Sequence, residues 1–357
     1  MNLMIVIDDL FRGGTEQTLK SRLHYLPPDW GVSIVVLYAK GAIGEEIENG
    51  GISVVCMDLA TNGYVKTIFN VRKKVKEFNP DIILFMRDVS RGLLPFFITG
   101  NGKKVLFWDN TIIYKSFRQF YSEFFQVKVG KAYFLCSSDA IAENLKKYYN
   151  RKNIKIISNC YDERLFRFKD ILKNSNRKEK RILSVGSMRS EKNHAAKIEI
   201  AKILKSRNIK FTLDIMGRGD FSSIKKIIND YNLNKEVNII GEVSDLYEII
   251  HNYDLFLMTS HTEGSPVALL EALASGLPCV VYSFYGLESL RQIDNVIFNV
   301  KNKTASEAAD TIIKIINQND DTMIKYLENA SQFAFDNYSS ENNATEWMDY
   351  LFSLISN

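Results

Sequence analysis

The chain has 357 residues, of which 46% are hydrophobic and 25% are charged, and its formal net charge is +4. This composition excludes a disordered chain and suffices for two ordinary domains, and no run of about 18 apolar residues predicts a membrane-spanning helix. The cysteines are scattered, without the spacing of a disulfide framework or a metal site, and the N-terminal MNLMIVIDD lacks the features of a signal peptide. We therefore expect a cytoplasmic protein without a metal ion.

Short apolar runs alternate with amphipathic helical patterns through the first 160 residues. Strands are predicted at Leu3–Ile7, Ser33–Tyr38, Ser53–Asp58, Asp81–Phe85, Lys104–Trp108, Ala132–Cys136 and Ile154–Ile157. Helices are predicted between them at 15–25, 65–78 and 139–149. This alternation is typical of a doubly wound parallel sheet.

The pattern stops at residues 161–180, which are charged and have no sustained apolar period. It then resumes, with strands predicted at Arg181–Val185, Phe211–Met216, Val237–Ile240, Asp254–Met258 and Cys279–Tyr282. We therefore expect an α/β fold of two Rossmann-like domains with parallel sheets that face each other across a cleft. The expected parts are a first domain at 1–165, a linker at 166–180, a second domain at 181–335 and a C-terminal helix at 336–357 that packs on the first domain.

Glycine turns join strands to helices in both domains. Gly13 and Gly14 follow the first strand, and Gly186 ends the first strand of the second domain, with Arg189 and Lys192 before the next helix. Paired glycines let a backbone approach a ligand, and cations beside a helix N-terminus suit a diphosphate. Ordinary solvated loops are the alternative at both places, and the G-x-G-x-x-G spacing of a nicotinamide site is missing.

Two further glycine turns, Gly217–Gly219 and Gly241–Val243, also follow predicted strands. Parallel sheets bind ligands at the carboxyl ends of their strands, so these turns predict a nucleotide-sized site.

The stretch from Ser260 to Val281 contains two carboxylates near the start of a predicted helix. Ser265 is expected to cap this helix and Pro266 to be its first residue. Glu263 precedes the helix and Glu271 lies inside it, so both side chains are expected to face one crevice. Taken alone, they could be an acid/base pair or two ligand-holding groups.

These stretches resemble the motifs of family-4 glycosyltransferases, retaining enzymes with the two-domain GT-B fold. EGSPVALLEALASGLPCV is similar to the E-x7-E signature of that family, and SVGSMRSEKN, LDIMGRGD, NIIGEVSD and YDLFLMTS resemble other motifs in the same order. GGTEQT and ISNCYDERLF resemble its N-terminal glycine loop and its interdomain segment. The resemblance implies transfer of a sugar from a nucleotide-diphosphate donor, with a UDP-sugar favoured, to a glycan or lipid-linked acceptor in cell-surface polysaccharide synthesis. It implies no cofactor and no metal.

The resemblance also implies a role for each matching residue. Glu271 would accept hydrogen bonds from the ribose, Glu263 would contact the transferred sugar, and Lys192 would neutralise the diphosphate. The other implied donor-binding residues are Gly14, Gly186, Arg189, Gly217, Arg218, Gly241, Val243, Gly264, Ser265, Pro266 and Val267. Glu263, Lys192 and Asp109 are the candidate catalytic residues.

Two positions depart from the family pattern. Ser187 stands where the family usually has an arginine, so either Arg189 substitutes for that arginine or the loop is rebuilt. Asp109 stands near the place where the family often has a histidine beside the acceptor. This aspartate would hold a hydroxyl of a substrate, or it would cap the following helix.

Residues 112–131 are aromatic and basic at helical spacing, and include Lys115, Arg118 and Lys128. They predict either a peripheral membrane contact that reaches lipid-linked acceptors or a core-facing helix with a charged outer side. No nucleic-acid-binding module is recognisable. The rival functions are a sugar-nucleotide 2-epimerase of the same architecture and a two-domain sugar-binding protein of periplasmic type.

Overall fold

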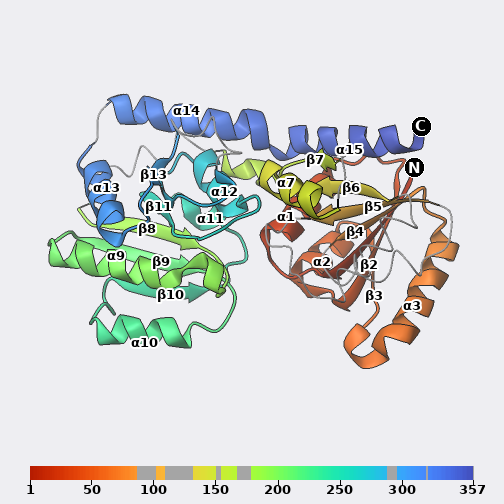
Figure 1. Ribbon diagram of the computed structural model, residues 1–357, viewed down its shortest axis with the longest axis horizontal. Coiled ribbons are helices and arrows are strands. Elements are labelled where there is room, and N and C mark those ends of the chain that lie inside the picture. The colour runs from red at the N-terminus through yellow and green to blue at the C-terminus, as the bar shows by residue number, and fades with distance from the viewer. Residues whose placement is uncertain are drawn as a thin grey trace. The chain divides into compact units, whose positions relative to one another are not determined.

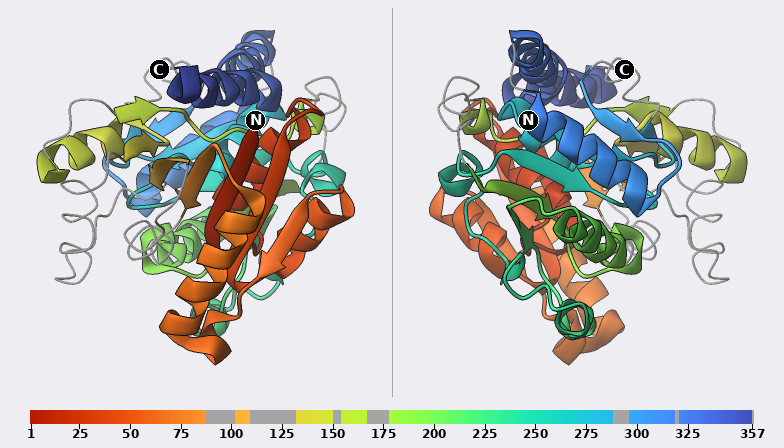
Figure 2. Two further views of the ribbon diagram at one scale, coloured as in Figure 1. Left: turned by 90° about the vertical axis from the view of Figure 1, so that its right-hand side faces the viewer. Right: turned by 90° about the vertical axis from the view of Figure 1, so that its left-hand side faces the viewer.

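The computed structural model describes residues 1–86, 102–108, 132–149, 154–166, 178–287, 296–318 and 321–356. The chain divides into two compact units, Met1–Cys160 with Ser340–Asn357, and Tyr161–Ser339. In the described residues, each unit is built on one parallel sheet with helices on both faces (Figure 1, Figure 2). No helix in this described part is long and apolar enough to cross a membrane.

The sheet of the first unit has the order β3-β2-β1-β4-β5-β6-β7, and its neighbouring strands are parallel. The strands are β1 (Asn2–Asp9), β2 (Gly31–Ala39), β3 (Ser53–Cys56), β4 (Ile82–Met86), β5 (Lys103–Trp108), β6 (Tyr133–Cys136) and β7 (Ile154–Ile156). The central strand β1 is buried on both faces, which explains its nearly continuous apolar run. The strands predicted for this half of the chain are thus confirmed.

Helices cover the two faces of this sheet in separate groups. They are α1 (Gly14–His24), α2 (Gly41–Asn49), α3 (Leu59–Phe78), α7 (Asp139–Tyr149) and α15 (Ser340–Ser356). Side chains of α1, α2 and α15 share one core, and those of α3 and α7 share the other. The sequence did not predict α2, which begins at Gly41 in the left-handed conformation (φ 60°).

A buried arginine joins the C-terminal helix α15 to α1 inside the first unit. The Nε of Arg22 donates to Oδ1 of Asn343 at 2.8 Å and its Nη2 donates to the carbonyl oxygen of Ser158 at 2.9 Å. The guanidinium carbon lies 5.6 Å from the centre of the Trp347 ring. Burial lowers the pKa of Arg22 from its usual range, and the contacts with Asn343, Ser158 and Trp347 stabilise the charged group.

The sheet of the second unit has the order β10-β9-β8-β11-β12-β13 and is also parallel. Its strands are β8 (Lys180–Val185), β9 (Phe211–Met216), β10 (Val237–Gly241), β11 (Leu255–Met258), β12 (Cys279–Tyr282) and β13 (Phe298–Val300), the last of which the sequence did not predict. Its helices are α9 (His194–Ser206), α10 (Ser222–Asp230), α11 (Tyr247–Ile250), α12 (Val267–Ala274), α13 (Ala305–Asn317) and α14 (Asp321–Tyr338), with short 3-10 segments η1 (Glu163–Leu165) and η3 (Ser190–Lys192).

The unit boundaries differ by a few residues from those expected at 165 and 335. Tyr161 and Leu165 are buried in a core of the second unit, and the N–H of Tyr161 donates to the carbonyl oxygen of Tyr338 at 3.3 Å. The first boundary therefore follows Cys160, and the second follows Ser339, after the end of α14. Most of the expected linker, residues 167–177, lies outside the described residues.

Replacing Arg22 tests how strongly α15 is held. Arg22→Met should destabilise the protein by about 3 kcal/mol, because it leaves buried acceptors without their charged donor. Thermal unfolding should show a fall in Tm of roughly 6–12 °C. The control Arg207→Met removes a surface ion pair with Asp310 and should change Tm little. Equal effects of the two substitutions would contradict a structural role of the buried arginine.

Candidate active site

The loops that follow β8, β9, β10 and β11 lie next to one another, because these strands are neighbours in the sheet. The N–H of Gly186 donates to the carbonyl oxygen of Met216 and the N–H of Gly217 donates to that of Gly241, both at 2.8 Å. Gly217 has φ 152°, and a Cβ there would lie 2.0 Å from the carbonyl oxygen of Gly186. Glycine is therefore required where these backbones meet. The structure brings the predicted turns of this unit together at one edge of the sheet.

An ion pair links the loop after β8 to the loop after β11. The Nζ of Lys192, in η3, lies 2.7 Å and 2.8 Å from the two carboxylate oxygens of Glu263. The Glu263 side chain is 9% exposed and that of Lys192 is 23% exposed. Backbone hydrogen bonds hold the loops on either side, since the N–H of His261 donates to the carbonyl oxygen of Glu191 at 2.8 Å. Glu263, which was predicted to contact a sugar, is thus paired with Lys192, which was predicted to hold a diphosphate.

Behind this pair lies a buried lysine that the sequence did not single out. Lys197, in α9, is 2% exposed, and its Nζ lies 3.1 Å from Nδ1 of His194. The other ring nitrogen of His194, Nε2, lies 3.0 Å from the carbonyl oxygen of Ser187. A carbonyl only accepts, so Nε2 carries the proton and Nδ1 accepts from Lys197. The histidine therefore ties the start of α9 to the strand-end loop.

Burial opposes protonation of both Lys197 and His194. Burial lowers the pKa of His194 to about 4, with Lys197 and Lys192 adding to the effect. Burial also lowers the pKa of Lys197 to about 7, with the positive charge of Lys192 acting in the same direction and Glu263 opposing it. The position of Lys197 carries a signal in the sequence, because it lies four and seven residues before Ala201 and Leu204 on the buried side of α9.

Glu271, in α12, is partly exposed, and its surroundings differ from those of Glu263. Burial raises the pKa of Glu271 to about 8, and the negative charges of Asp162 and Asp245 contribute. Both aspartates are already paired with Arg164, whose guanidinium nitrogens lie 2.6 Å from Asp162 and 3.0 Å from Asp245. The raised pKa of Glu271 favours its protonated form, which can donate a hydrogen bond as well as accept one.

The start of α12 differs from the sequence prediction. The helix begins at Val267, and its N-cap residue is Pro266, with φ −77° and ψ 89°, so Ser265 is not the N-cap and Pro266 is not the first helical residue. The ψ of Pro266 is not helical, and no side chain caps this end. Since proline has no N–H, only Gly264, Ser265 and Val267 can offer the amide donors expected in this loop. At the other end Gly276, with φ 75°, stops the helix as predicted.

The remaining predicted site residues have varied settings. Arg218 is exposed, and its carbonyl oxygen accepts from the N–H of Met188 at 2.8 Å. The Arg189 side chain is 60% exposed and lies 4.0 Å from Glu191. Val243 packs at the edge of a core of the second unit. Gly14 opens α1 in the first unit, and Asp109 and the segment 112–131 lie outside the described residues.

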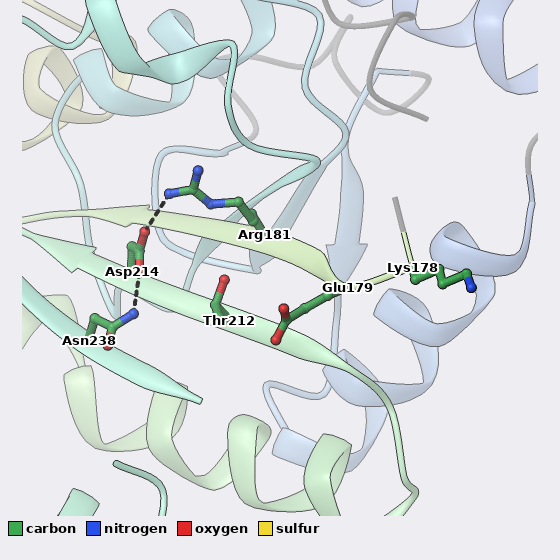
Figure 3. A pocket seen from close by; sticks show the side chains of 6 residues that line it. All are labelled: Lys178, Glu179, Arg181, Thr212, Asp214 and Asn238. Carbon is green, nitrogen blue, oxygen red and sulfur yellow. Dashed lines mark hydrogen bonds and ion pairs between the residues drawn. The ribbon is translucent and has the colours of Figure 1, made fainter. Parts of the chain in front are cut away.

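An open cavity of about 530 Å³ lies at the amino ends of β8, β9 and β10, away from these loops (Figure 3). Its lining includes Asp214, which accepts hydrogen bonds from Arg181 at 3.2 Å and from Asn238 at 2.8 Å. The hydroxyl of Tyr253 also donates to Asp214 at 2.8 Å. These contacts satisfy the carboxylate, which indicates a structural role. Among the described residues no group of three His, Cys, Asp or Glu side chains could hold a metal ion.

Comparison with known proteins identifies the fold and the second unit. The structure of Anabaena Alr3699/HepE in complex with UDP and glucose superposes with a TM-score of 0.83 and 17% identity, over 99% of this chain and 100% of that one. The two Rossmann-like units thus form the GT-B fold that glycosyltransferases share. Residues 167–334 match the family described as "Glycosyl transferases group 1".

Relatives by sequence match parts of the chain. "Putative glycosyltransferase EpsF" of Bacillus subtilis is 40% identical over 91 residues, which is 25% of this chain and 24% of that protein. "Capsular polysaccharide biosynthesis glycosyltransferase CapH" of Staphylococcus aureus is 25% identical over 288 residues, which is 76% of this chain and 78% of that protein. The chain spans about a quarter to a third of the length of the first curated relatives that it matches.

Lys197 should make folding stability depend on pH, and Lys197→Met should remove that dependence. An unfolded lysine has a pKa of about 10.4, so between about pH 7 and that value the unfolded chain binds more protons than the folded protein, and folding stability rises with pH. The stability of the variant relative to wild type should therefore fall by about 2 kcal/mol from about pH 7 to about pH 9. Urea unfolding at each pH measures this difference.

The matched control is Lys202→Met in the same helix, where the side chain is 52% exposed. Its stability should follow that of wild type across the pH range. A constant difference between Lys197→Met and wild type at all pH values would contradict the assignment.

Proposed function

We propose that the protein is a retaining family-4 glycosyltransferase that moves a sugar from a nucleotide-diphosphate sugar to a glycan or lipid-linked acceptor. The observation that carries the proposal is the Lys192–Glu263 pair at the carboxyl edge of the second sheet, beside the joined glycine turns. The group 1 glycosyltransferase domain and the name of CapH support a role in cell-surface polysaccharide synthesis. The UDP and glucose named for HepE support a UDP-sugar as the donor.

The charge balance of the site explains how a diphosphate would bind. Lys192 faces Glu263, while Lys197 lies behind them with a neutral histidine as its contact. A bound diphosphate would pair with Lys192 together with Glu263 or in its place. Oxygen atoms of Glu263 would then be available to accept hydrogen bonds from sugar hydroxyls. Because negative charge grows on the diphosphate as the glycosidic bond breaks, a fixed cation and backbone N–H groups stabilise the transition state more than the ground state.

The protonated carboxyl of Glu271 suits a ribose. It offers one O–H donor and an acceptor oxygen, which match a pair of neighbouring hydroxyls. We place the ribose beside Glu271 and the nucleobase beside Arg218 and Gly241–Val243, as the motif resemblance implies. The 2-epimerase alternative needs no acceptor, so turnover of the donor without acceptor would favour it over transfer.

The proposal places the protein in the cytoplasm, with contact to the inner face of the membrane where a lipid-linked acceptor would be reached. Segment 112–131 remains a sequence-based candidate for that contact.

Nucleotide binding tests the role of Lys192. Among UDP-, GDP- and ADP-sugars, a UDP-sugar should raise Tm most, because a ligand that binds the folded state stabilises it. Lys192→Met should weaken UDP binding about 30-fold, measured by isothermal titration, through loss of a charged hydrogen bond. The double variant Lys192→Met with Glu263→Gln removes the unpaired carboxylate and should bind as weakly. The surface control Lys226→Met should bind as wild type does. Unchanged affinity in both Lys192 variants would sink the assignment.

The ribose contact of Glu271 is tested by a cycle of protein and ligand changes. Wild type should bind UDP about tenfold more tightly than 2′-deoxy-UDP, because 2′-deoxy-UDP lacks the hydroxyl and so makes one hydrogen bond fewer with the site. In Glu271→Ala this preference should disappear, while Glu271→Gln should keep part of it because its amide can still donate and accept. If Glu271→Ala weakens both ligands and the preference persists, the carboxyl does not contact that hydroxyl.

A further inference from the structure

The solvent face of α3 exposes apolar side chains that the core of the first unit does not use. Val65 is 71% exposed and Phe69 is 65% exposed, more than any other large hydrophobic residue among those the structure describes. Tyr64, beside them, is 51% exposed. Figure 1 shows α3 (orange) beside the sheet of the first unit. An isolated exposed side chain is ordinary, but adjacent ones on a single helix mark a contact surface.

The periodicity of α3 explains why these residues face outward. Thr67, Val71 and Val75 recur every four residues and are buried, with Val71 and Val75 packed in the core that α3 shares with α7. Val65 and Phe69 are also four residues apart, and they lie on the opposite side of the helix. The helix therefore carries one apolar stripe for the core and a second one toward solvent.

The helix α3 is also strongly basic. The helix contains the cations Lys66, Arg72, Lys73, Lys74 and Lys76 and the single acid Glu77, so five positive charges less one negative charge give +4. Glu77 pairs with Lys74 at 2.8 Å, and the Lys73 side chain remains 76% exposed. Arg72, Lys73 and Lys76 follow Phe69 by three, four and seven residues, which places them on the face that Val65 and Phe69 share.

We propose that this α3 face, formed by Val65, Phe69, Arg72, Lys73 and Lys76, docks onto a bilayer that contains anionic lipids. The aliphatic and aromatic side chains would enter the headgroup region, and the cations would meet lipid phosphates. A second copy of the chain fits less well, because the three cations of one face would repel the three cations of the other. A nucleic acid would match the cations but would leave Val65 without an apolar partner. The docking does not depend on the donor site, which lies in the other unit.

Vesicle co-sedimentation tests the proposal. The whole protein should bind vesicles with about 30% phosphatidylglycerol at low salt, bind far less to pure phosphatidylcholine vesicles, and dissociate at about 0.5 M salt. Val65→Ser with Phe69→Ser, and separately Lys73→Glu with Lys76→Glu, should each lower the partition coefficient at least tenfold.

The matched control is Lys225→Glu with Lys226→Glu on α10, which makes the same change in net charge on another exposed helix. It should bind vesicles nearly as wild type does. Equal loss in the control would show that total charge rather than the α3 face drives binding, and would overturn the proposal. So would a dimer in solution that Phe69→Ser dissociates while vesicle binding stays unchanged, or binding of single-stranded RNA without binding of vesicles.

Thermal stabilisation by UDP separates this proposal from the proposed function. The α3 variants should melt and respond to UDP as wild type does, which shows that they are folded. Vesicle binding without stabilisation by UDP would contradict the proposed glycosyltransferase function but not the proposed docking of the α3 face. Stabilisation by UDP without vesicle binding would contradict only the docking proposal.

Discussion

The contact between Lys192 and Glu263 is the interaction on which the candidate site depends. It joins loops from two neighbouring strands, and both side chains are largely withdrawn from water. Ions in such a place persist only when they are paired, because desolvation is unfavourable for each of them alone. Lys197 lies behind the pair, where burial and the charge of Lys192 lower its pKa and the charge of Glu263 raises it. Lys197 would add a second positive charge to this cluster only in its protonated form, which an anionic ligand beside Lys192 would favour.

The two glutamates of the E-x7-E stretch have different chemistry although they share a motif. Glu263 is paired with a lysine, whereas Glu271 is subject to the charges of two aspartates that share Arg164 as their counter-ion. Burial, with the negative charges of Asp162 and Asp245 adding to the effect, raises the pKa of Glu271 to about 8. Divergent environments of this kind assign different roles to chemically identical groups. The acid/base-pair interpretation is less suitable than two separate ligand contacts, because each glutamate belongs to its own charge cluster.

The fold followed from the sequence because apolar runs and glycine turns are local signals. Gly217 is an example, since its positive φ and its contact with Gly186 exclude a side chain. The sequence predictions were wrong where tertiary contacts determine the local structure. Pro266 adopts a non-helical ψ that the helix-start pattern does not specify. Tyr161 is buried in a core of the second unit although the residues that follow it, 162–164, are charged. The spacing of Lys197 to Ala201 and Leu204 indicates which side of α9 it lies on, but a lysine there could also extend its charged end to solvent, so the sequence alone does not show its burial.

The position of Lys197 bears on the arginine that the family usually has at residue 187. The loop keeps its shape through backbone contacts, because the carbonyl oxygen of Ser187 accepts from the N–H of Arg189 at 2.8 Å and from His194. Two cations that could replace the missing charge are the exposed Arg189 and the buried Lys197. Water screens a charge at the surface, whereas a buried charge acts more strongly over the same distance. A diphosphate beside Lys192 would also favour the protonated form of Lys197, so ligand binding and the second positive charge would support each other.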